Sequence, residues 1–224
     1  MNVAQVVDAT VTPLDDVLEE VARVVFAGGT VIFPTDTSYA IACDPYHPES
    51  VDRIYGVKQR PDERPMTMHV ASPAEFLEYA GDSPLAALAA KRLLPGPVIF
   101  LIDKPAFVGD DLAAGLQTMA FRVPDDSFAR ALLERCGPLA GTAVHVREPV
   151  DSPRYRGGDD YSMLPVADLL VRHGAPRYDR ESSIVDLTGP RARLLREGAV
   201  PFSRLTELLG PLERPTVKVR TTRP

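Results

Sequence analysis

An uninterrupted apolar run, Val98 to Ile102, constrains the fold more than any other feature of the chain. It follows the break Pro95-Gly96-Pro97, and such a run beside turn residues is typical of a strand that is covered on both faces. Val31-Ile32-Phe33 is a second short apolar run, and Pro34 stops it. Strands buried in this way need helices packed against their sheet, so these runs favour a layered α/β domain.

Helical patterns alternate with the apolar runs. An apolar stripe from Leu14 to Val25 follows Thr12, which we expect to cap a helix that has Pro13 at its first position and ends at Gly28-Gly29. The stretch Ser72-Pro73-Ala74-Glu75 has the spacing of a capping box and predicts another helix start. Further helices are expected over 49–55, 85–94, 126–136, 163–173 and 202–209, and further strands over 66–70, 119–123, 183–187 and 191–195.

The composition argues against several classes of protein. A formal net charge of −6 disfavours broad, non-specific binding to nucleic acid. The chain does not begin with a basic region followed by an apolar core, and no run approaches about 18 apolar residues, so we expect neither a secretion signal nor a membrane span. Cys43 and Cys136 lie far apart without metal-ligand spacing, which favours a reduced, cytoplasmic protein and leaves a disulfide open.

The length of 224 residues suits one domain with a tail. We expect the domain to cover residues 1–210 and residues 211–224 to form a basic, proline-containing C-terminal tail with few core residues. Proline contributes 22 residues, many of them at helix starts or in loops, which suggests rigid connections rather than disorder.

Polar side chains stand at the ends of several expected strands. Thr35-Asp36-Thr37 follows the run that Pro34 stops, and strand ends are where open sheets bind ligands. His69 lies at the far end of the expected strand 66–70. Arg122 stands inside an expected strand, where a buried guanidinium requires a partner. These positions predict a site for a small polar molecule.

A cationic stretch separates the first two of these positions. Lys58, Arg60 and Arg64 lie close together, and Pro61 and Pro65 prevent one regular helix from carrying all three. We therefore expect a constrained cationic loop that binds an anion. Spacing alone favours a solvated surface loop for Arg60 and Arg64, because charge clusters are commonly solvated.

Six ordered stretches resemble the YrdC-like family. They are PTDTSYA at 34–40, KQRPDERPMTMHV at 58–70, LLPGP at 93–97, AFRVP at 120–124, ESSIVDLT at 181–188 and LLREGA at 194–199. The resemblance extends over residues 12 to 205 and is to the short, single-domain form. It implies an α/β fold with a twisted, open mixed sheet flanked by helices and with a concave cationic surface.

The resemblance also implies an activity. Members of the family make threonylcarbamoyl-AMP from L-threonine, bicarbonate and ATP and release pyrophosphate, and the product feeds the threonylcarbamoylation of adenosine in tRNA. The chain is thus expected to be a nucleotidyltransferase that uses ATP as a substrate, with Mg²⁺ accompanying the ATP. Its expected partners are the threonylcarbamoyl transfer machinery and, as an open point, double-stranded RNA or tRNA, with no membrane and a cytoplasmic location.

Residue roles carried over from the family divide into three sets. The positions expected around threonine, with the arginine on its carboxylate, are Thr35, Thr37, His69, Arg122 and Ser182. The positions expected to act in catalysis are Lys58 and Arg60. The positions expected to contact nucleotide are Arg60, Arg64, Thr118, Thr142, His145 and Arg196, and no metal ligand is expected. Cations suit this chemistry because attack of a carbamate on the α-phosphorus of ATP develops negative charge.

Two stretches depart from the family pattern. The usual Ser-Ala-Asn is Ala143-Val144-His145 here, which removes a hydroxyl and an amide, and the usual TVYGL is Thr37-Ser38-Tyr39-Ala40-Ile41. His145 can still donate a hydrogen bond to phosphate, and Thr142 can partly replace the hydroxyl. The departures keep a second function open, namely a non-catalytic relative that binds nucleotide or RNA. Carbamoyl transfer to another acceptor is disfavoured by the short chain.

Overall fold

One mixed β-sheet organises the computed structural model, which describes residues 5–58, 66–109, 112, 113, 115–144, 166–178 and 180–214. Within these residues the strand order is β1-β8-β2-β3-β7-β4-β6-β5-β9-β10. The strands are β1 (Gln5–Asp8), β2 (Thr30–Pro34), β3 (Tyr39–Cys43), β4 (Thr67–His69), β5 (Val98–Asp103), β6 (Thr118–Arg122), β7 (Leu139–Ala143), β8 (Leu169–Arg172), β9 (Ser183–Asp186) and β10 (Arg193–Arg196). The helices are α1 (Leu14–Phe26), α2 (Pro48–Lys58), α3 (Pro73–Ala80), α4 (Pro84–Leu93), α5 (Ser127–Cys136) and α6 (Phe202–Leu209). The expected mixed α/β fold is confirmed.

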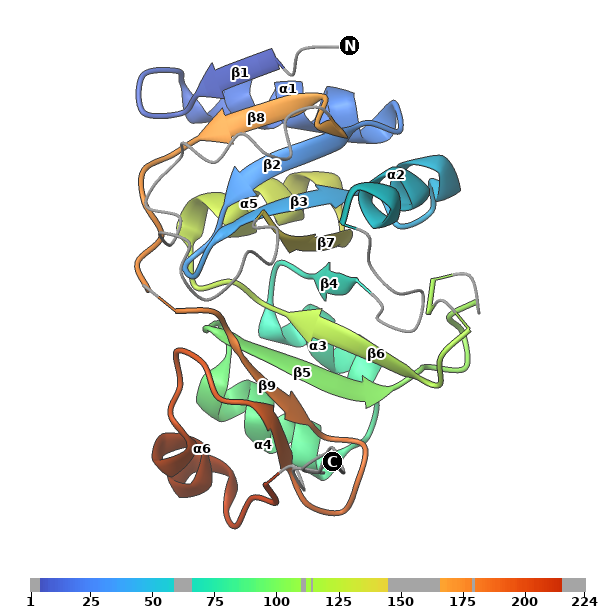
Figure 1. The fold of residues 1–224 in the computed structure, drawn as a ribbon, viewed down its shortest axis with the longest axis vertical. Helices are drawn as coiled ribbons and strands as arrows, with labels where there is room; N and C mark the ends of the chain where they lie inside the picture. The colour runs from blue at the N-terminus through green and yellow to red at the C-terminus, as the bar shows by residue number, and fades with distance from the viewer. Residues whose placement is uncertain are drawn as a thin grey trace, which may run out of the picture.

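Different helices cover the two halves of the sheet (Figure 1). Helices α1 and α5 lie beside the half that contains β8, β2 and β3, whereas α3, α4 and α6 lie beside the half that contains β6, β5 and β9. The described core forms two clusters, one with Val21, Phe33 and Leu132 and one with Phe76 and Ile41. The second cluster is not confined to one half of the sheet, because it reaches from α3 to β3. The segment from β8 to β9 crosses between the halves, so it passes the strand ends near the middle of the sheet.

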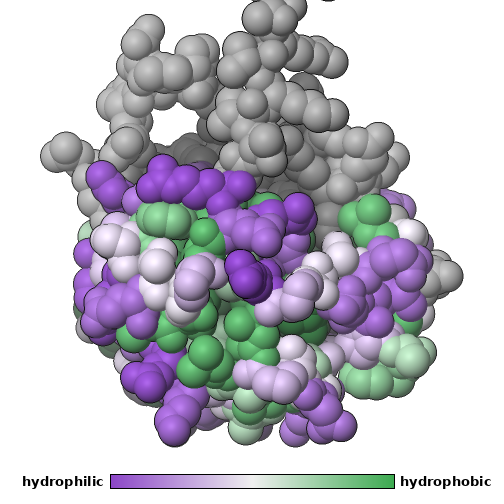
Figure 2. Space-filling view, turned by 90° about the horizontal axis from the view of Figure 1, so that it is seen from below, coloured by the Kyte–Doolittle hydropathy of each residue, from purple (hydrophilic) through white to green (hydrophobic). Residues whose placement is uncertain are grey.

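The end of the molecule that carries α4 and α6 shows how these short helices are packed. Half-buried apolar side chains of both helices, such as Leu88 and Leu208, pack against the second cluster. Seen from below, hydrophobic side chains gather toward the middle of this end, with hydrophilic side chains around them (Figure 2). This mixture is ordinary for amphipathic helices on one face of a sheet.

The two apolar runs both form strands, with different degrees of cover. In β2 every residue is buried, as expected for a strand covered on both faces. In β5, Val98 and Phe100 are buried but Ile99 and Leu101 are half-buried, so the prediction of full cover on both faces was wrong for this strand. Neighbouring strands on both sides, β6 and β9, still enclose its backbone.

The largest error in the expected elements concerns residues 163–173. Instead of a helix, residues 169–172 form strand β8, which pairs in parallel with β1 on one side and with β2 on the other. Leu169, Leu170 and Val171 are all buried there. An apolar run this short has no period of its own that separates a strand from a helix turn, so its pairing partners decide.

Smaller corrections concern the starts and ends of helices. Thr12 does not cap α1, because Pro13 holds the cap position without a side-chain hydrogen bond. Helix α2 runs to Lys58, beyond the expected end at residue 55, so Lys58 ends a helix instead of standing on the expected loop. The side chain of Lys58, and Arg60 and Arg64 altogether, lie outside the described residues.

The segment after α6 continues along the sheet edge. Glu213 pairs in parallel with Arg193, with hydrogen bonds from the Leu194 N–H to the Glu213 carbonyl (2.9 Å) and from the Glu213 N–H to the Ala192 carbonyl (3.1 Å). Residues 215–224 lie outside the described residues, and the proposed boundary at residue 210 stays a prediction.

Two further sequence expectations bear on chemistry. Cys43 and Cys136 are both free thiols, and burial raises their pKa values to about 12 and about 11, so both stay protonated at neutral pH. None of the helices in the described part of the chain combines the length and hydropathy that crossing a membrane requires.

Candidate functional site

The turn between β2 and β3, residues 35–38, is the centre of the site and is called the hydroxyl turn below. Thr35 fixes its shape, because the Thr35 N–H and Oγ1 both donate to the Ser38 carbonyl, at 3.0 and 2.6 Å. The Thr35 Oγ1 also accepts from the N–H groups of Thr37 and Ser38, at 3.3 Å each. Its hydroxyl is thus engaged within the turn, and contact with threonine through Thr35 stays a prediction.

Asp36 of this turn is the partner that Arg122 required. The Arg122 Nη2 donates to the Asp36 Oδ1 at 2.5 Å, and the two side chains are 5% and 0% exposed. The expectation that a guanidinium in an apolar strand needs a partner is therefore confirmed. The sequence placed Asp36 at the strand exit together with the two threonines, but roles were predicted only for the threonines. The pairing of Asp36 with Arg122 was not predicted.

The ion pair is incompletely satisfied. Among the described residues, the Asp36 Oδ2 and the Arg122 Nε are buried and have no hydrogen-bond partner. Burial raises the pKa of Asp36 above its usual value, and the attraction of Arg122 and nearby backbone N–H groups oppose that rise without cancelling it. Burial likewise lowers the pKa of Arg122, which Asp36 counteracts.

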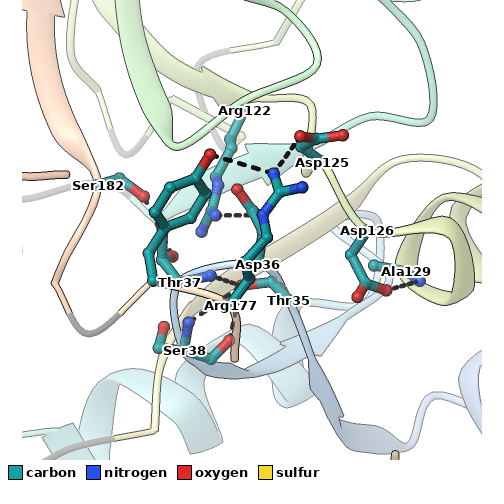
Figure 3. A network of polar contacts seen from close by, with 11 residues as sticks. Thr35, Asp36, Thr37, Ser38, Arg122, Asp125, Asp126, Ala129, Arg177 and Ser182 are labelled. Atoms are coloured by element: carbon teal, nitrogen blue, oxygen red, sulfur yellow. Dashed lines mark hydrogen bonds and ion pairs between the residues drawn. The ribbon is translucent and has the colours of Figure 1, made fainter. Parts of the chain in front are cut away.

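The connection from β8 to β9 lies against the hydroxyl turn (Figure 3). This segment, residues 173–178 and 180–182, is called the strap. The Tyr178 N–H donates to the Asp36 carbonyl at 2.8 Å, and the Ser182 Oγ lies 3.3 Å from the Thr37 Oγ1, where either hydroxyl can donate. Arg177 forms an ion pair with Asp125 and donates to the Tyr178 hydroxyl. Thr37, Ser182 and the Asp36–Arg122 pair are thereby brought together.

Both ends of the strap are anchored. At the β8 end the Tyr39 hydroxyl donates to the Gly174 carbonyl at 2.8 Å and accepts from the His173 N–H at 3.1 Å. At the β9 end Arg196 donates to the Ser182 carbonyl from Nε (3.1 Å) and Nη2 (2.8 Å) and pairs with Glu181 at 2.7 Å. In this structure Arg196 holds the backbone of Ser182, and its contact with nucleotide stays a prediction.

His69 lies beside Arg122 at the ends of the parallel strands β4 and β6. Its Nδ1 is 3.1 Å from the Thr67 carbonyl, and its ring meets Phe33 edge to face at 6.3 Å between centroids. Burial, helped by the charge of Arg122, lowers the pKa of His69 to about 3. The imidazole is therefore neutral at physiological pH and can offer a ligand a hydrogen bond but no charge.

The residues expected to contact nucleotide are less close to one another than those around Asp36 and Arg122. Thr118 begins β6 whereas Arg122 ends it, which places them roughly 13 Å apart along the strand at about 3.3 Å per residue. Thr142 lies in β7 opposite Ile41, and Ala143 lies opposite Ala40. His145, like Arg60 and Arg64, falls outside the described residues.

The described arrangement supports recognition of a small polar molecule. A buried charge pair, two hydroxyls and a neutral imidazole meet at one place, and burial strengthens each polar contact that a ligand makes there. In the described part of the chain, no group of three or more His, Cys, Asp or Glu residues could hold a metal ion.

Comparisons with known proteins found a matching family model, relatives and solved structures. The family model Sua5/YciO/YrdC, described as telomere recombination, matches residues 23–198. A threonylcarbamoyl-AMP synthase from Pyrococcus abyssi is 29% identical over 187 residues, which are 82% of this chain and 54% of that protein. The chain thus spans about half the length of this relative.

Two solved structures share the fold. Sua5 of Pyrococcus abyssi, complexed with L-threonine, has a TM-score of 0.82 at 26% identity, with 95% of this chain and 62% of that chain covered. YciO of Escherichia coli has a TM-score of 0.75 at 25% identity, with 88% of this chain and 96% of that chain covered.

Proposed function

This chain belongs to the Sua5/YciO/YrdC family, and we propose that it makes threonylcarbamoyl-AMP from L-threonine, bicarbonate and ATP, with release of pyrophosphate. The observation that carries the proposal is the buried Arg122 beside the Thr37–Ser182 hydroxyl pair. A guanidinium and two hydroxyls suit a carboxylate and a hydroxyl, and threonine carries both groups. A relative that shares the fold was solved with L-threonine bound.

The described residues would act by positioning. Arg122 would bind the carboxylate of threonine, and the Thr37–Ser182 pair would bind its hydroxyl. Neutral His69 would contribute a hydrogen bond without repelling the ammonium group. Fixing the amino acid in this way converts its encounter with the other reactants into a step within one complex, which lowers the entropic part of the barrier.

The reaction has two chemical steps, and neither requires a covalent intermediate with the enzyme. The bound ammonium group of threonine first releases a proton to water. The free amine then attacks the carbon of bicarbonate, water leaves, and a carbamate forms. A carbamate oxygen then attacks the α-phosphorus of ATP, and pyrophosphate leaves. Within the proposal, Lys58, Arg60 and Arg64 stabilise the negative charge that develops on the phosphates.

The nucleotide contacts complete the proposal. Thr118, Thr142, His145 and Arg196 would contact nucleotide, and Mg²⁺ would be bound mainly by ATP oxygens and water, since the described residues offer it no cluster of three acids or histidines.

The rest of the chain and the fate of the product belong to the same function. Residues 1–210 would form the catalytic domain, with 211–224 as a basic tail. The product would pass, in the cytoplasm, to the machinery that modifies tRNA, with direct contact to tRNA or double-stranded RNA as part of the same proposal.

A second candidate function rests on the altered stretch Ala143-Val144-His145. Ala143 lies in β7 without the hydroxyl that the family pattern has at that position. A relative that binds nucleotide or RNA without catalysis would tolerate this loss.

One incubation separates the two candidates. The purified chain is given ATP, Mg²⁺, bicarbonate and L-threonine, and mass spectrometry monitors threonylcarbamoyl-AMP while a coupled assay monitors pyrophosphate. The Arg60→Ala variant should lose turnover and keep its fold, and Arg135→Ala, an exposed arginine of α5, serves as the matched control. If the wild-type protein forms no product in this incubation, the synthase is rejected, and binding of ATP by the same protein in a calorimetric titration would favour the second candidate.

A further inference from the structure

The Asp36–Arg122 ion pair leaves one acceptor and one donor unused. One hydrogen bond, Nη2 to Oδ1 at 2.5 Å, joins the two side chains. The Asp36 Oδ2 and the Arg122 Nε are both buried without a partner among the described residues. Backbone N–H groups of Asp36 and Asp125 approach the carboxylate, but none forms a hydrogen bond with Oδ2. Buried polar atoms are satisfied in most folded proteins, so this pair requires an explanation.

A purely structural pair would have a better geometry available. Carboxylate and guanidinium groups can face each other through two parallel hydrogen bonds, which satisfy both oxygens and two nitrogens at once. Here only one hydrogen bond joins the carboxylate and the guanidinium. The Asp36 Oδ2 therefore stays available as an acceptor and the Arg122 Nε as a donor. Such an arrangement complements a ligand that itself carries one donor and one acceptor close together.

The charges define the class of ligand. The pair is net neutral and almost fully buried, and a ligand with net charge would leave an uncompensated charge in the site. An α-amino acid carries an ammonium donor and a carboxylate acceptor on one carbon and is net neutral. We propose that Asp36 is a specificity-determining residue, whose Oδ2 accepts a hydrogen bond from the α-ammonium group while Arg122 binds the α-carboxylate. This inference rests on the proposed function, which makes an amino acid the substrate.

The strap and the hydroxyl turn place two hydroxyls near the pair. Ser182 and Thr37 point toward Arg122 from two different segments (Figure 3), and their hydroxyls meet in one long contact of 3.3 Å. The Tyr178 N–H adds one hydrogen bond to the backbone of Asp36. A ligand that opens the contact between the hydroxyls lies directly beside the charge pair, with both hydroxyls free to bind its side chain.

The test separates recognition of the ammonium group from support of Arg122. Calorimetric titrations, with and without a non-hydrolysable ATP analogue, measure L-threonine and 3-hydroxybutyrate, which keeps the carboxylate and hydroxyl but lacks the ammonium group. Wild-type protein should bind threonine about 10- to 100-fold more tightly, the range for a hydrogen bond between charged groups. Asp36→Asn should lower threonine affinity by that factor and leave 3-hydroxybutyrate unchanged or tighter. Asp82→Asn, an exposed acid between α3 and α4, should change neither.

Three outcomes would overturn the inference. Equal loss of both ligands in Asp36→Asn would mean that Asp36 serves to hold Arg122. If wild-type protein binds both ligands with equal affinity, or does not bind threonine, recognition of the ammonium group is rejected. Both results come from wild-type protein, so they decide the question even if Asp36→Asn does not fold. If the chain prefers threonine to 3-hydroxybutyrate but makes no threonylcarbamoyl-AMP, the role of Asp36 stands and the synthase is rejected. If it makes threonylcarbamoyl-AMP without that preference, the synthase stands and the role of Asp36 is rejected.

Discussion

Replacing Arg122 with methionine should destabilise the fold strongly at neutral pH and less at acidic pH. Methionine keeps much of the length of the side chain and removes its charge, so the buried carboxylate of Asp36 loses the group that compensates it. The Asp36 side chain is 0% exposed and Arg122 is 5% exposed, so water cannot replace the lost partner. Breaking a buried ion pair from one side costs about 3 to 5 kcal/mol of the free energy of unfolding.

The pH dependence follows from the direction of the shift of Asp36. Its pKa is already above the ordinary value of 3.8 in the folded protein, and Arg122 is the main group that holds it down. Removing Arg122 raises this pKa further. A carboxyl whose pKa is higher in the folded than in the unfolded state contributes stability below the unfolded value, and that contribution is lost as the pH rises through the folded value. The Arg122→Met deficit should therefore shrink as the pH falls toward 4.

His69 moves the result in the same direction. Its pKa is about 3, partly because of the charge of Arg122. Without that charge the folded protein binds a proton at His69 more readily at acidic pH, which relieves part of the penalty that a buried neutral histidine imposes there.

Urea unfolding, monitored by circular dichroism at about pH 7 and about pH 5, measures the change in the free energy of unfolding. In a thermal scan the melting temperature should drop by roughly 6 to 20 °C at the higher pH, because each kcal/mol lowers it by about 2 to 4 °C. Arg92→Met, an exposed arginine of α4, is the matched control. The double variant Asp36→Asn/Arg122→Met should be more stable than Arg122→Met at about pH 7. A deficit below about 1 kcal/mol, or one that is equal at both pH values, would refute the reasoning.

Further predictions concern four single positions. A Cβ at Gly198 would lie 2.2 Å from the Glu181 carbonyl, so Gly198→Ala should displace the end of the strap, lower the melting temperature and weaken threonine binding. Gly56→Ala, where the added Cβ meets nothing within 4 Å, should be neutral or slightly stabilising, as expected within a helix. The imidazole resonances of His69 should stay constant from about pH 5 to pH 8, because its pKa is about 3. Nucleotide affinity should fall as pH rises through the ordinary histidine range in wild-type protein and not in His145→Asn, and identical titrations of the two proteins would assign His145 a structural role.

The sequence predicted the elements whose boundaries are encoded locally. Ser72 accepts a hydrogen bond from the Glu75 N–H and starts α3, as the capping-box spacing indicated. The β2 strand ends at Pro34 and gives way to the hydroxyl turn. In both cases the deciding interactions lie within a few residues of each other, so a single stretch of sequence contains them.

Strand β8 shows what local patterns do not contain. Its apolar residues fit one face of a helix as well as a strand, and its neighbours β1 and β2 begin at Gln5 and Thr30, far away in the sequence. Parallel pairing supplies the hydrogen bonds of β8 and buries it. Because the competing helix would be equally apolar, the pattern of residues 163–173 alone does not separate the two structures.

The same distinction explains why roles were predicted for the threonines of the hydroxyl turn and not for Asp36, which stands between them. Residue types that bind threonine directed attention to the hydroxyls, yet the hydroxyl of Thr35 is engaged by groups of its own turn. Asp36 has its side-chain partner 86 positions away, and its own neighbourhood cannot neutralise a buried carboxylate. The need of Arg122 for an acid follows from its place in an apolar strand, and Asp36 stands at a strand exit where it can meet that need. A buried arginine needs an acid, and a buried acid needs a cation. Matching Arg122 with Asp36 on these grounds places Asp36 in the site, whereas matching residue types to a ligand does not.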